Sequence, residues 1–178
     1  MMSPSSLEAI KSAIRNVPDF PVKGIQFKDI TTAIKQPDLL QLIVEQLAGH
    51  YRDKGITKIV AVESRGFITG GALAYRLGAG FVPVRKPGKL PAEVFSKSYD
   101  LEYGQDSLEI HQDALQADDI VLLHDDLLAT GGTALAALDL ISRFCVRQVF
   151  VSFIIELDFL RGRQKLSPSC DVMSLIHY

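Results

Sequence analysis

Two adjacent carboxylates, Asp125 and Asp126, lie between an apolar run and a loop of small residues. The apolar run, 120–123, is typical of a strand buried on both faces of a parallel sheet. The loop, 129–133, leads into a segment at 134–144 with apolar residues at helical spacing. Backbone N–H groups at a helix start, beside glycines that allow close approach, favour phosphate binding. Two acids beside such a loop suit a sugar phosphate, because carboxylates accept hydrogen bonds from hydroxyl groups. The acids could instead cap the helix while the glycines only turn the chain.

A second strand–turn–helix pattern carries a cation. The run 58–62 predicts a buried strand, and Ser64 and Arg65 follow it, ahead of a helix of small residues at 68–77. Ligands of open α/β sheets bind at the carboxyl ends of the strands. A guanidinium fork there suits a diphosphate, because it donates in parallel and stays charged. The alternative is a surface ion pair between Arg65 and Glu63 or another acid.

A cationic loop and a hairpin come next along the chain. Arg85, Lys86 and Lys89 lie close together between prolines, a pattern that usually marks a solvated surface. Segment 94–114 predicts a β-hairpin bent near Gly104. A hairpin of this length is either an ordinary sheet edge or a lid over a site.

The remaining elements alternate in type. Strands alternating with helices predict an α/β fold with a mostly parallel sheet and helices on both faces. Pro83 places its strand at a sheet edge, because proline donates no ladder hydrogen bond. We expect helices at 7–17, 37–52 and 161–166, strands at 81–84, 148–155 and 171–176, and a loop with a short extended piece at 20–30.

Composition narrows the classes of function. The 178 residues predict one domain, 1–178, and a net charge of −2 gives no general reason to bind nucleic acid or an anionic membrane. No apolar run has the length of a membrane span, and the first residues show no signal peptide, so a cytoplasmic location is expected. Cys145 and Cys170 lack metal-ligand spacing and are expected to be free thiols.

These motifs together resemble those of the type I phosphoribosyltransferases. The run 120–133, with its Asp-Asp and Thr-Gly-Gly-Thr, is similar to the family's loop for phosphoribosyl pyrophosphate (PRPP). Glu-Ser-Arg-Gly-Phe at 63–67 is close to its pyrophosphate loop, and 20–30 resembles the base-binding loop of adenine-specific members. The resemblance covers nearly the whole chain. It implies the type I phosphoribosyltransferase fold, with a flexible β-hairpin lid at about 94–114. A small hood would be formed by the N-terminal segment (about 1–34, a helix and the base-binding loop) and the C-terminal segment.

The resemblance also implies an activity. The chain would transfer the 5-phosphoribosyl group of PRPP to adenine, giving AMP and pyrophosphate, in purine salvage. Mg²⁺ would be held mainly by PRPP and water, with Asp125 or Asp126 as its candidate protein ligand. A homodimer is implied in which the 85–89 loop reaches the neighbouring site. Two alternatives stay open: a transferase for hypoxanthine, guanine or xanthine, and a non-catalytic PRPP sensor.

By resemblance, individual residues receive roles. Asp125 and Asp126 would hold the ribose hydroxyl groups and favour a cationic sugar. Arg65 would bind the leaving pyrophosphate, and Glu102 would exchange a proton with the purine. Further PRPP-binding residues would be Ser64, Arg85, Lys86, Lys89, Tyr103, Ala129, Thr130, Gly131, Gly132 and Thr133. Base-binding residues would be Gln26, Phe27, Lys28 and Leu157.

Two of these positions have a simpler interpretation. Leu157 could be plain core. His124 stands where the family usually has an aliphatic residue, and a lone imidazole at a strand end is most often hydrogen-bonded to its neighbours. We therefore expect a structural role for His124.

Overall fold

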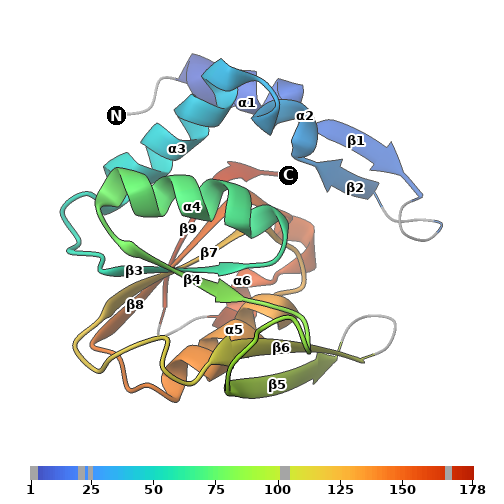
Figure 1. Ribbon diagram of the computed structural model, residues 1–178. Coiled ribbons are helices and arrows are strands. Elements are labelled where there is room, and N and C mark those ends of the chain that lie inside the picture. Colours follow the sequence, from blue (N-terminus) through green and yellow to red (C-terminus); the bar gives the residue numbers. More distant parts are fainter. Residues whose placement is uncertain (1–3, 20–22, 24–25, 101–104, 167–169) are drawn as a thin grey trace.

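Five parallel strands form the centre of the molecule (Figure 1). The computed structural model describes residues 4–19, 23, 26–100, 105–166 and 170–178. The strand order is β4-β3-β7-β8-β9, and β4 lies at the edge, as Pro83 predicts. The bounds are β3 Lys58–Val62, β4 Gly80–Val84, β7 Ile120–Leu128, β8 Gln148–Glu156 and β9 Asp171–His177.

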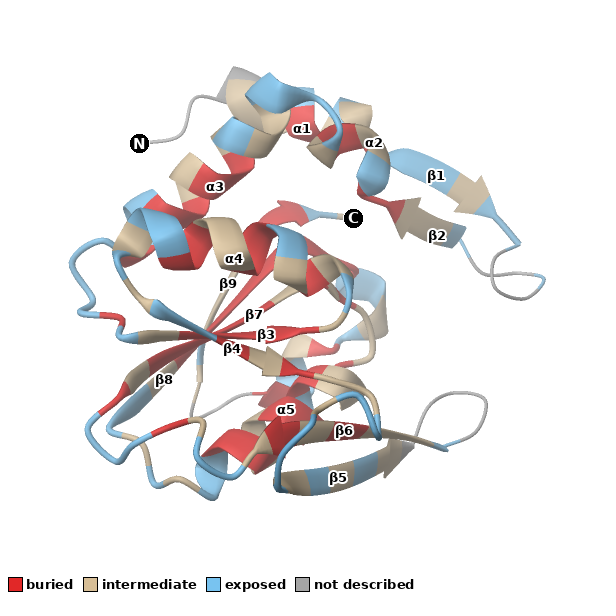
Figure 2. Cartoon of the chain, in the orientation of Figure 1, coloured by how far each residue is buried: buried red, intermediate tan, exposed pale blue. Residues whose placement is uncertain are grey.

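Helices cover both faces of this sheet. On one face lie α3 (Pro37–Tyr51) and α4 (Arg65–Leu77), and on the other lie α5 (Gly132–Ser142) and α6 (Arg163–Leu166) (Figure 1). Successive residues of β7 alternate between two hydrophobic clusters: Leu122 packs in the cluster with α3 and α4, and Leu123 in the cluster with α5. The central strands are therefore buried on both sides (Figure 2). The predicted α/β fold with a parallel sheet is confirmed.

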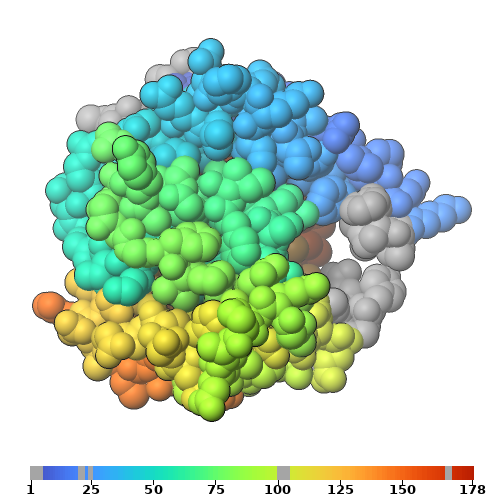
Figure 3. All heavy atoms as spheres, viewed as in Figure 1, coloured from blue at the N-terminus to red at the C-terminus, as the bar shows by residue number. Residues whose placement is uncertain are grey.

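Two antiparallel pairs flank the sheet. The strands β5 (Val94–Asp100) and β6 (Gln105–His111) form the predicted hairpin, with Tyr99 opposite Asp106. Its bend near Gly104 lies outside the described residues. Figure 3 shows the N-terminal residues in blue and the hairpin in yellow-green at opposite ends of one face of the molecule. The N-terminal elements are α1 Pro4–Ala13, β1 Arg15–Pro18, β2 Gln26–Asp29 and α2 Thr31–Ile34.

The helix expected at 7–17 is wrong in its last third. Residues Arg15–Pro18 form strand β1, which pairs antiparallel with β2. The Arg15 guanidinium also binds the Asp29 carboxylate across this pair, with Nε 3.1 Å from Oδ2. Cross-strand pairing thus overrides the helical spacing of the apolar residues, a tertiary effect that local pattern does not contain.

Other boundaries shift by less. β7 does not end at residue 123 but continues through Asp125 and Asp126, with Asp125 in register with Phe153 of β8. Helix α4 begins at Arg65, three residues before the predicted start at 68. The predicted helix at 161–166 is the shorter α6, which begins at Arg163, and a 3₁₀ turn, η1 (Asp158–Leu160), precedes it. None of the helices in the described part of the chain is long and apolar enough to cross a membrane.

Candidate active site

The loop between β7 and α5 has the conformation of an anion site. Gly131 has a φ of +83° and precedes the first helical residue, Gly132. Among the described residues no side chain caps this helix, and its first-turn N–H groups have no acceptor earlier in the helix. A hollow of about 60 Å³ opens here. It is lined by Asp125, Leu127, Leu128, Ala129, Thr130, Gly131, Gly132, Thr133, Ala134 and Phe153, which include the whole predicted phosphate loop.

Gly162, which the sequence analysis missed, packs directly against the backbone of this loop. A Cβ at Gly162 would overlap the carbonyl oxygen of Ala129, and a Cβ at Gly131 would lie 2.8 Å from the Gly162 carbonyl oxygen. The two backbones can approach this closely only because both residues are glycine. In the sequence, Gly162 is merely a glycine in a basic turn, with no signal that it contacts a loop thirty residues earlier.

The two predicted acids are adjacent near the carboxyl end of β7. The Asp126 side chain is only 5% exposed and its Oδ2 lies 2.5 Å from Arg65 Nε, while Asp125 is partly buried and its Oδ1 accepts the Asp126 N–H at 2.8 Å. Burial, together with repulsion from Asp126, raises the pKa of Asp125 well above its ordinary value. Burial opposes the charge of Arg65, but attraction to Asp126 outweighs it and raises the pKa of Arg65. The acid pair and its cation form one coupled cluster.

A cavity of about 280 Å³ joins this cluster to the cationic turn. Ser64 and Arg65 enter it from the start of α4, Asp125 and Asp126 from β7, and Lys86 from the cationic loop. It is lined by Val62, Glu63, Ser64, Arg65, Lys86, Tyr99, Asp106, Asp125, Asp126, Leu127, Ala129 and Thr133. Residues predicted to bind the sugar and the pyrophosphate thus meet in one place. The Glu63–Ser64 peptide bond in this wall is cis.

Not every predicted cation lines this cavity. Arg85 instead binds Glu63, with Nε 2.6 Å from Oε2, and donates to the Lys89 carbonyl at 3.1 Å. Lys86 alone of the three loop cations is among the cavity residues, and it lines the cavity of its own chain. A reach of Arg85 and Lys89 toward a neighbouring site stays a prediction.

Tyr99 and Asp106 are site residues that the sequence analysis missed. They face each other across the β5–β6 hairpin, and both line the cavity. Asp106 forms an ion pair with Lys86, and the Tyr99 hydroxyl donates to Asp106 at 3.4 Å. The Thr133 hydroxyl in turn donates to the Tyr99 hydroxyl at 3.4 Å. The end of the hairpin next to its bend is therefore linked to both the cationic loop and the phosphate loop.

The predicted base-binding role of Gln26 and Lys28 uses their main-chain groups, so the contacts of their side chains leave it a prediction. Phe27 on β2 lies beside the cluster, with the Arg65 guanidinium 5.2 Å from its ring centroid. Lys28 Nζ instead lies 3.9 Å from the Tyr178 ring centroid, and Gln26 accepts a hydrogen bond from Asn16. Leu157 is 6% exposed and packs in the core, so a base-pocket role for it stays a prediction.

The predicted residues Glu102 and Tyr103 lie outside the described residues, as does Phe20 of the predicted base-binding loop.

His124 is fully buried and hydrogen-bonded on both ring nitrogens. Thr69 Oγ1 lies 2.8 Å from Nε2, and Ser152 Oγ lies 2.8 Å from Nδ1. Burial lowers the pKa of His124 to about 4, so the ring is neutral at pH 7. The expected structural role is confirmed: His124 ties α4 and β8 to the strand that carries the acid pair.

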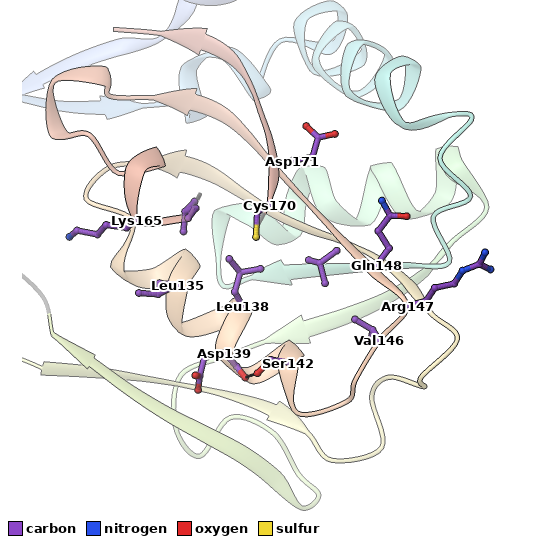
Figure 4. Close-up of a pocket in the computed structure, with 12 residues that line it drawn as sticks. Leu135, Leu138, Asp139, Ser142, Val146, Arg147, Gln148, Lys165, Cys170 and Asp171 are labelled. Atoms are coloured by element: carbon purple, nitrogen blue, oxygen red, sulfur yellow. Dashed lines mark hydrogen bonds between the residues drawn. The ribbon is translucent and has the colours of Figure 1, made fainter. Parts of the chain in front are cut away.

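Other hollows and clusters lie away from this site. A larger cavity, about 730 Å³, lies between α5, α6 and the starts of β8 and β9. Leu135, Asp139, Lys165 and Cys170 are among its labelled residues in Figure 4. None of its described lining residues is a predicted site residue. Glu156, Asp158 and His177 lie close enough to suggest a metal site, but Arg163 binds both oxygens of Glu156. Both cysteines are free, as expected.

Comparison with known proteins agrees with this geometry. Residues 31–168 match the family model of the phosphoribosyl transferase domain. The adenine phosphoribosyltransferase of Phocaeicola vulgatus is 54% identical over 171 residues, which are 96% of this chain and 98% of the relative. The chain belongs to the adenine phosphoribosyltransferase family.

Solved structures of adenine phosphoribosyltransferases share the whole fold. The Rhodothermus marinus structure has a TM-score of 0.93 and 50% identity, and the match covers 99% of this chain and all of that one. The Giardia lamblia structure, a complex with 9-deazaadenine, also has a TM-score of 0.93, with 41% identity and coverage of 100% and 99%. The type I phosphoribosyltransferase fold inferred from the motifs is confirmed.

Proposed function

We propose that this chain transfers the 5-phosphoribosyl group of PRPP to adenine and releases AMP and pyrophosphate. One observation carries the proposal: the acid pair, the Arg65 guanidinium and the end of the phosphate loop line a single cavity. A phosphorylated pentose placed there would meet backbone N–H groups at its 5′-phosphate and carboxylates at its hydroxyl groups. The pyrophosphate at its other end would meet Arg65, Ser64 and Lys86.

Each group acts on a defined part of the reaction. The bond from the ribosyl C1′ to the pyrophosphate oxygen breaks, and a bond from C1′ to the adenine N9 forms, while N9 loses its proton. As the first bond lengthens, C1′ gains oxocarbenium character, which the negative charge of Asp125 and Asp126 favours. Arg65 takes up the charge that develops on the leaving pyrophosphate. Glu102 is proposed to receive the N9 proton.

The donors at the site fit a magnesium ion. Mg²⁺ commonly binds through one or two carboxylates together with phosphate oxygens and water, and the partly buried Asp125 offers such an oxygen at the cavity wall. When bound, the ion would neutralise charge on the diphosphate. Asp125 is the better candidate ligand, since the Oδ2 of Asp126 is already bound by Arg65.

The base is proposed to lie between the hairpin arm and the N-terminal hood. Phe27 offers an aromatic face beside Arg65, which is where a purine next to C1′ would stack. Adenine structures in the family support this choice of base: the Giardia relative was solved with 9-deazaadenine, and the Saccharomyces cerevisiae relative with adenine and an imino-altritol bisphosphate. Closure of the 94–114 arm over the site, a homodimer and a cytoplasmic location complete the proposal.

A single incubation tests it. The protein is mixed with PRPP, Mg²⁺ and equal amounts of adenine, hypoxanthine, guanine and xanthine, and the nucleotides are separated and identified. We expect AMP to dominate. If another nucleotide dominates, the substrate is the corresponding base and not adenine. If no nucleotide forms under conditions where PRPP binds, the non-catalytic alternative is supported.

A further inference from the structure

The cations around the cavity already have anionic partners in the free protein. Arg65 binds Asp126, Arg85 binds Glu63, and Lys86 binds Asp106. Asp126 belongs to the acid pair and Glu63 to the turn that carries Arg65. Asp106 belongs to neither motif, and it lies at the cavity because β6 of the hairpin bridges to Arg85 of the cationic loop through Glu109.

Asp106 is held firmly in place. Its Oδ1 accepts the Ser107 N–H at 2.8 Å, and its Oδ2 receives both Lys86 and the Tyr99 hydroxyl. Burial opposes the charge of Asp106, but the hydrogen bonds from Lys86 and Ser107 outweigh it and lower the pKa of Asp106. The carboxylate is therefore a permanent anion on the cavity wall at neutral pH.

The ion pair is nevertheless open to replacement. The Lys86 side chain is 38% exposed and the Asp106 side chain 27% exposed, so water and a ligand can reach both groups. A lysine ammonium is a compact point charge on a flexible stem, which can exchange one oxygen partner for another without a fixed geometry. A phosphate oxygen entering the cavity must compete with Asp106 for this ammonium.

We propose that Asp106 is a positioning residue that holds Lys86 in the place of a pyrophosphate oxygen and thereby weakens the affinity for PRPP. This inference rests on the proposed function. When PRPP enters, its pyrophosphate displaces the Asp106 carboxylate from Lys86. Part of the binding free energy is used to break the ion pair, and the displaced carboxylate stays nearby as a like charge. The contact also determines where Lys86 points before the substrate arrives.

The proposal is tested by whether the affinity for PRPP and pyrophosphate rises or falls when the charge of Asp106 is removed. Asp106→Asn keeps the shape of the side chain and removes its charge, so we expect the KM for PRPP and the Kd for pyrophosphate to fall by about two- to fivefold, the range of a partly exposed ion pair. We expect kcat to change less than KM. Added salt should shrink the difference, because it screens exposed charges.

Two controls separate this effect from a loss of structure. Asp139→Asn breaks a similar ion pair, Lys97–Asp139 at 3.2 Å, between the same hairpin and α5, and should leave both affinities unchanged. In a Lys86→Met background, Asp106→Asn should have a smaller effect, because no ion pair is left to break and only the repulsion by the Asp106 charge is removed. Thermal unfolding of each variant checks its fold, and Asp106→Ala, which also removes the charge, should change affinity in the same direction.

The outcomes are distinct. An unchanged or raised pyrophosphate Kd in Asp106→Asn would overturn the inference, and so would an equal change in the Lys86→Met background. If the native protein forms no nucleotide, the proposed function fails. The pyrophosphate titration is independent of turnover, so it still tests the role of Asp106 in that case.

Discussion

The two sides of the cavity are built in different ways. On the phosphate-loop side, the proposed ligand groups are backbone N–H groups at the start of α5, and the close contact between Gly131 and Gly162 fixes their positions. On the pyrophosphate side, the ligand groups are side chains already engaged in ion pairs, such as Arg65 with Asp126 and Lys86 with Asp106. On the proposed function, the first side is complete before the ligand arrives, whereas the second must exchange partners. Changes to the two sides should therefore differ in size and in kind.

The largest effect is expected where the two sides meet. Replacing both acids, Asp125→Asn with Asp126→Asn, should lower kcat by about 10²- to 10³-fold, because the developing sugar cation loses its nearby negative charge. The fold should survive, since asparagine has nearly the same shape as aspartate and its side chain is uncharged. Steady-state turnover with PRPP and adenine measures the effect, and thermal unfolding checks the fold. An unchanged kcat would contradict the role of the acid pair.

A change beneath the phosphate loop should come next. Gly162→Ala places a methyl group against the Ala129 carbonyl oxygen and must displace the loop. Misplaced binding groups are costly, so we expect the KM for PRPP to rise by about 10- to 100-fold. The matched control is Gly71→Ala in α4, where an added Cβ meets nothing within 4 Å. If both variants behave alike, the loop is not as rigid as the contact implies.

A smaller effect is expected on the pyrophosphate side. Arg65→Ala should raise the KM for PRPP by about tenfold, near the lower end for a charged hydrogen bond, because Arg65 must first leave Asp126. The same variant leaves Asp126 buried without its cation, so its free energy of unfolding should be measured alongside the kinetics. Equal PRPP affinity in the variant and the native protein would contradict the assignment of Arg65.

The smallest effect is expected outside both sides. Asp29 accepts hydrogen bonds from the Thr31 hydroxyl and from Arg15, and these lower its pKa from 3.8 to about 2. Its charged form therefore stabilises the fold above about pH 4, and this stability is lost as the pH falls through about 2. Asp29→Asn should cost about 1 kcal/mol of unfolding free energy at pH 7, a value reduced because Arg15 is largely exposed. Denaturant unfolding at pH 7 and at about pH 2.5 should show the native protein losing stability that the variant never had.

Most of the phosphate-loop side could be predicted from the sequence. The apolar strand, the acid pair and the glycine loop are contiguous, so local pattern was enough to predict both their structure and their proximity. The same holds for Arg65, whose turn follows a buried strand of the same sheet. Parallel strands deliver their carboxyl ends to one edge, and this rule brought two distant motifs together.

The other features depend on contacts between segments that no local pattern connects. Asp106 lies near Lys86 because β6 bridges to Arg85 through Glu109, and Gly162 meets Ala129 from a separate turn. His124 was expected to be structural, but its partners, Thr69 and Ser152, lie 55 and 28 residues away on α4 and β8. The strand β1 was missed for the same reason, since its partner β2 lies across a loop.

One cavity is proposed to hold the two ends of PRPP by two separate sets of groups. The most direct test of this proposal is titration calorimetry of ribose 5-phosphate and of pyrophosphate into three proteins: native, Gly162→Ala and Arg65→Ala. We predict a crossed pattern, in which Gly162→Ala weakens ribose 5-phosphate binding by about tenfold or more and changes pyrophosphate binding little, while Arg65→Ala does the reverse. If each variant weakened both ligands equally, or neither, the division of the cavity into a phosphate-loop side and a pyrophosphate side would be wrong.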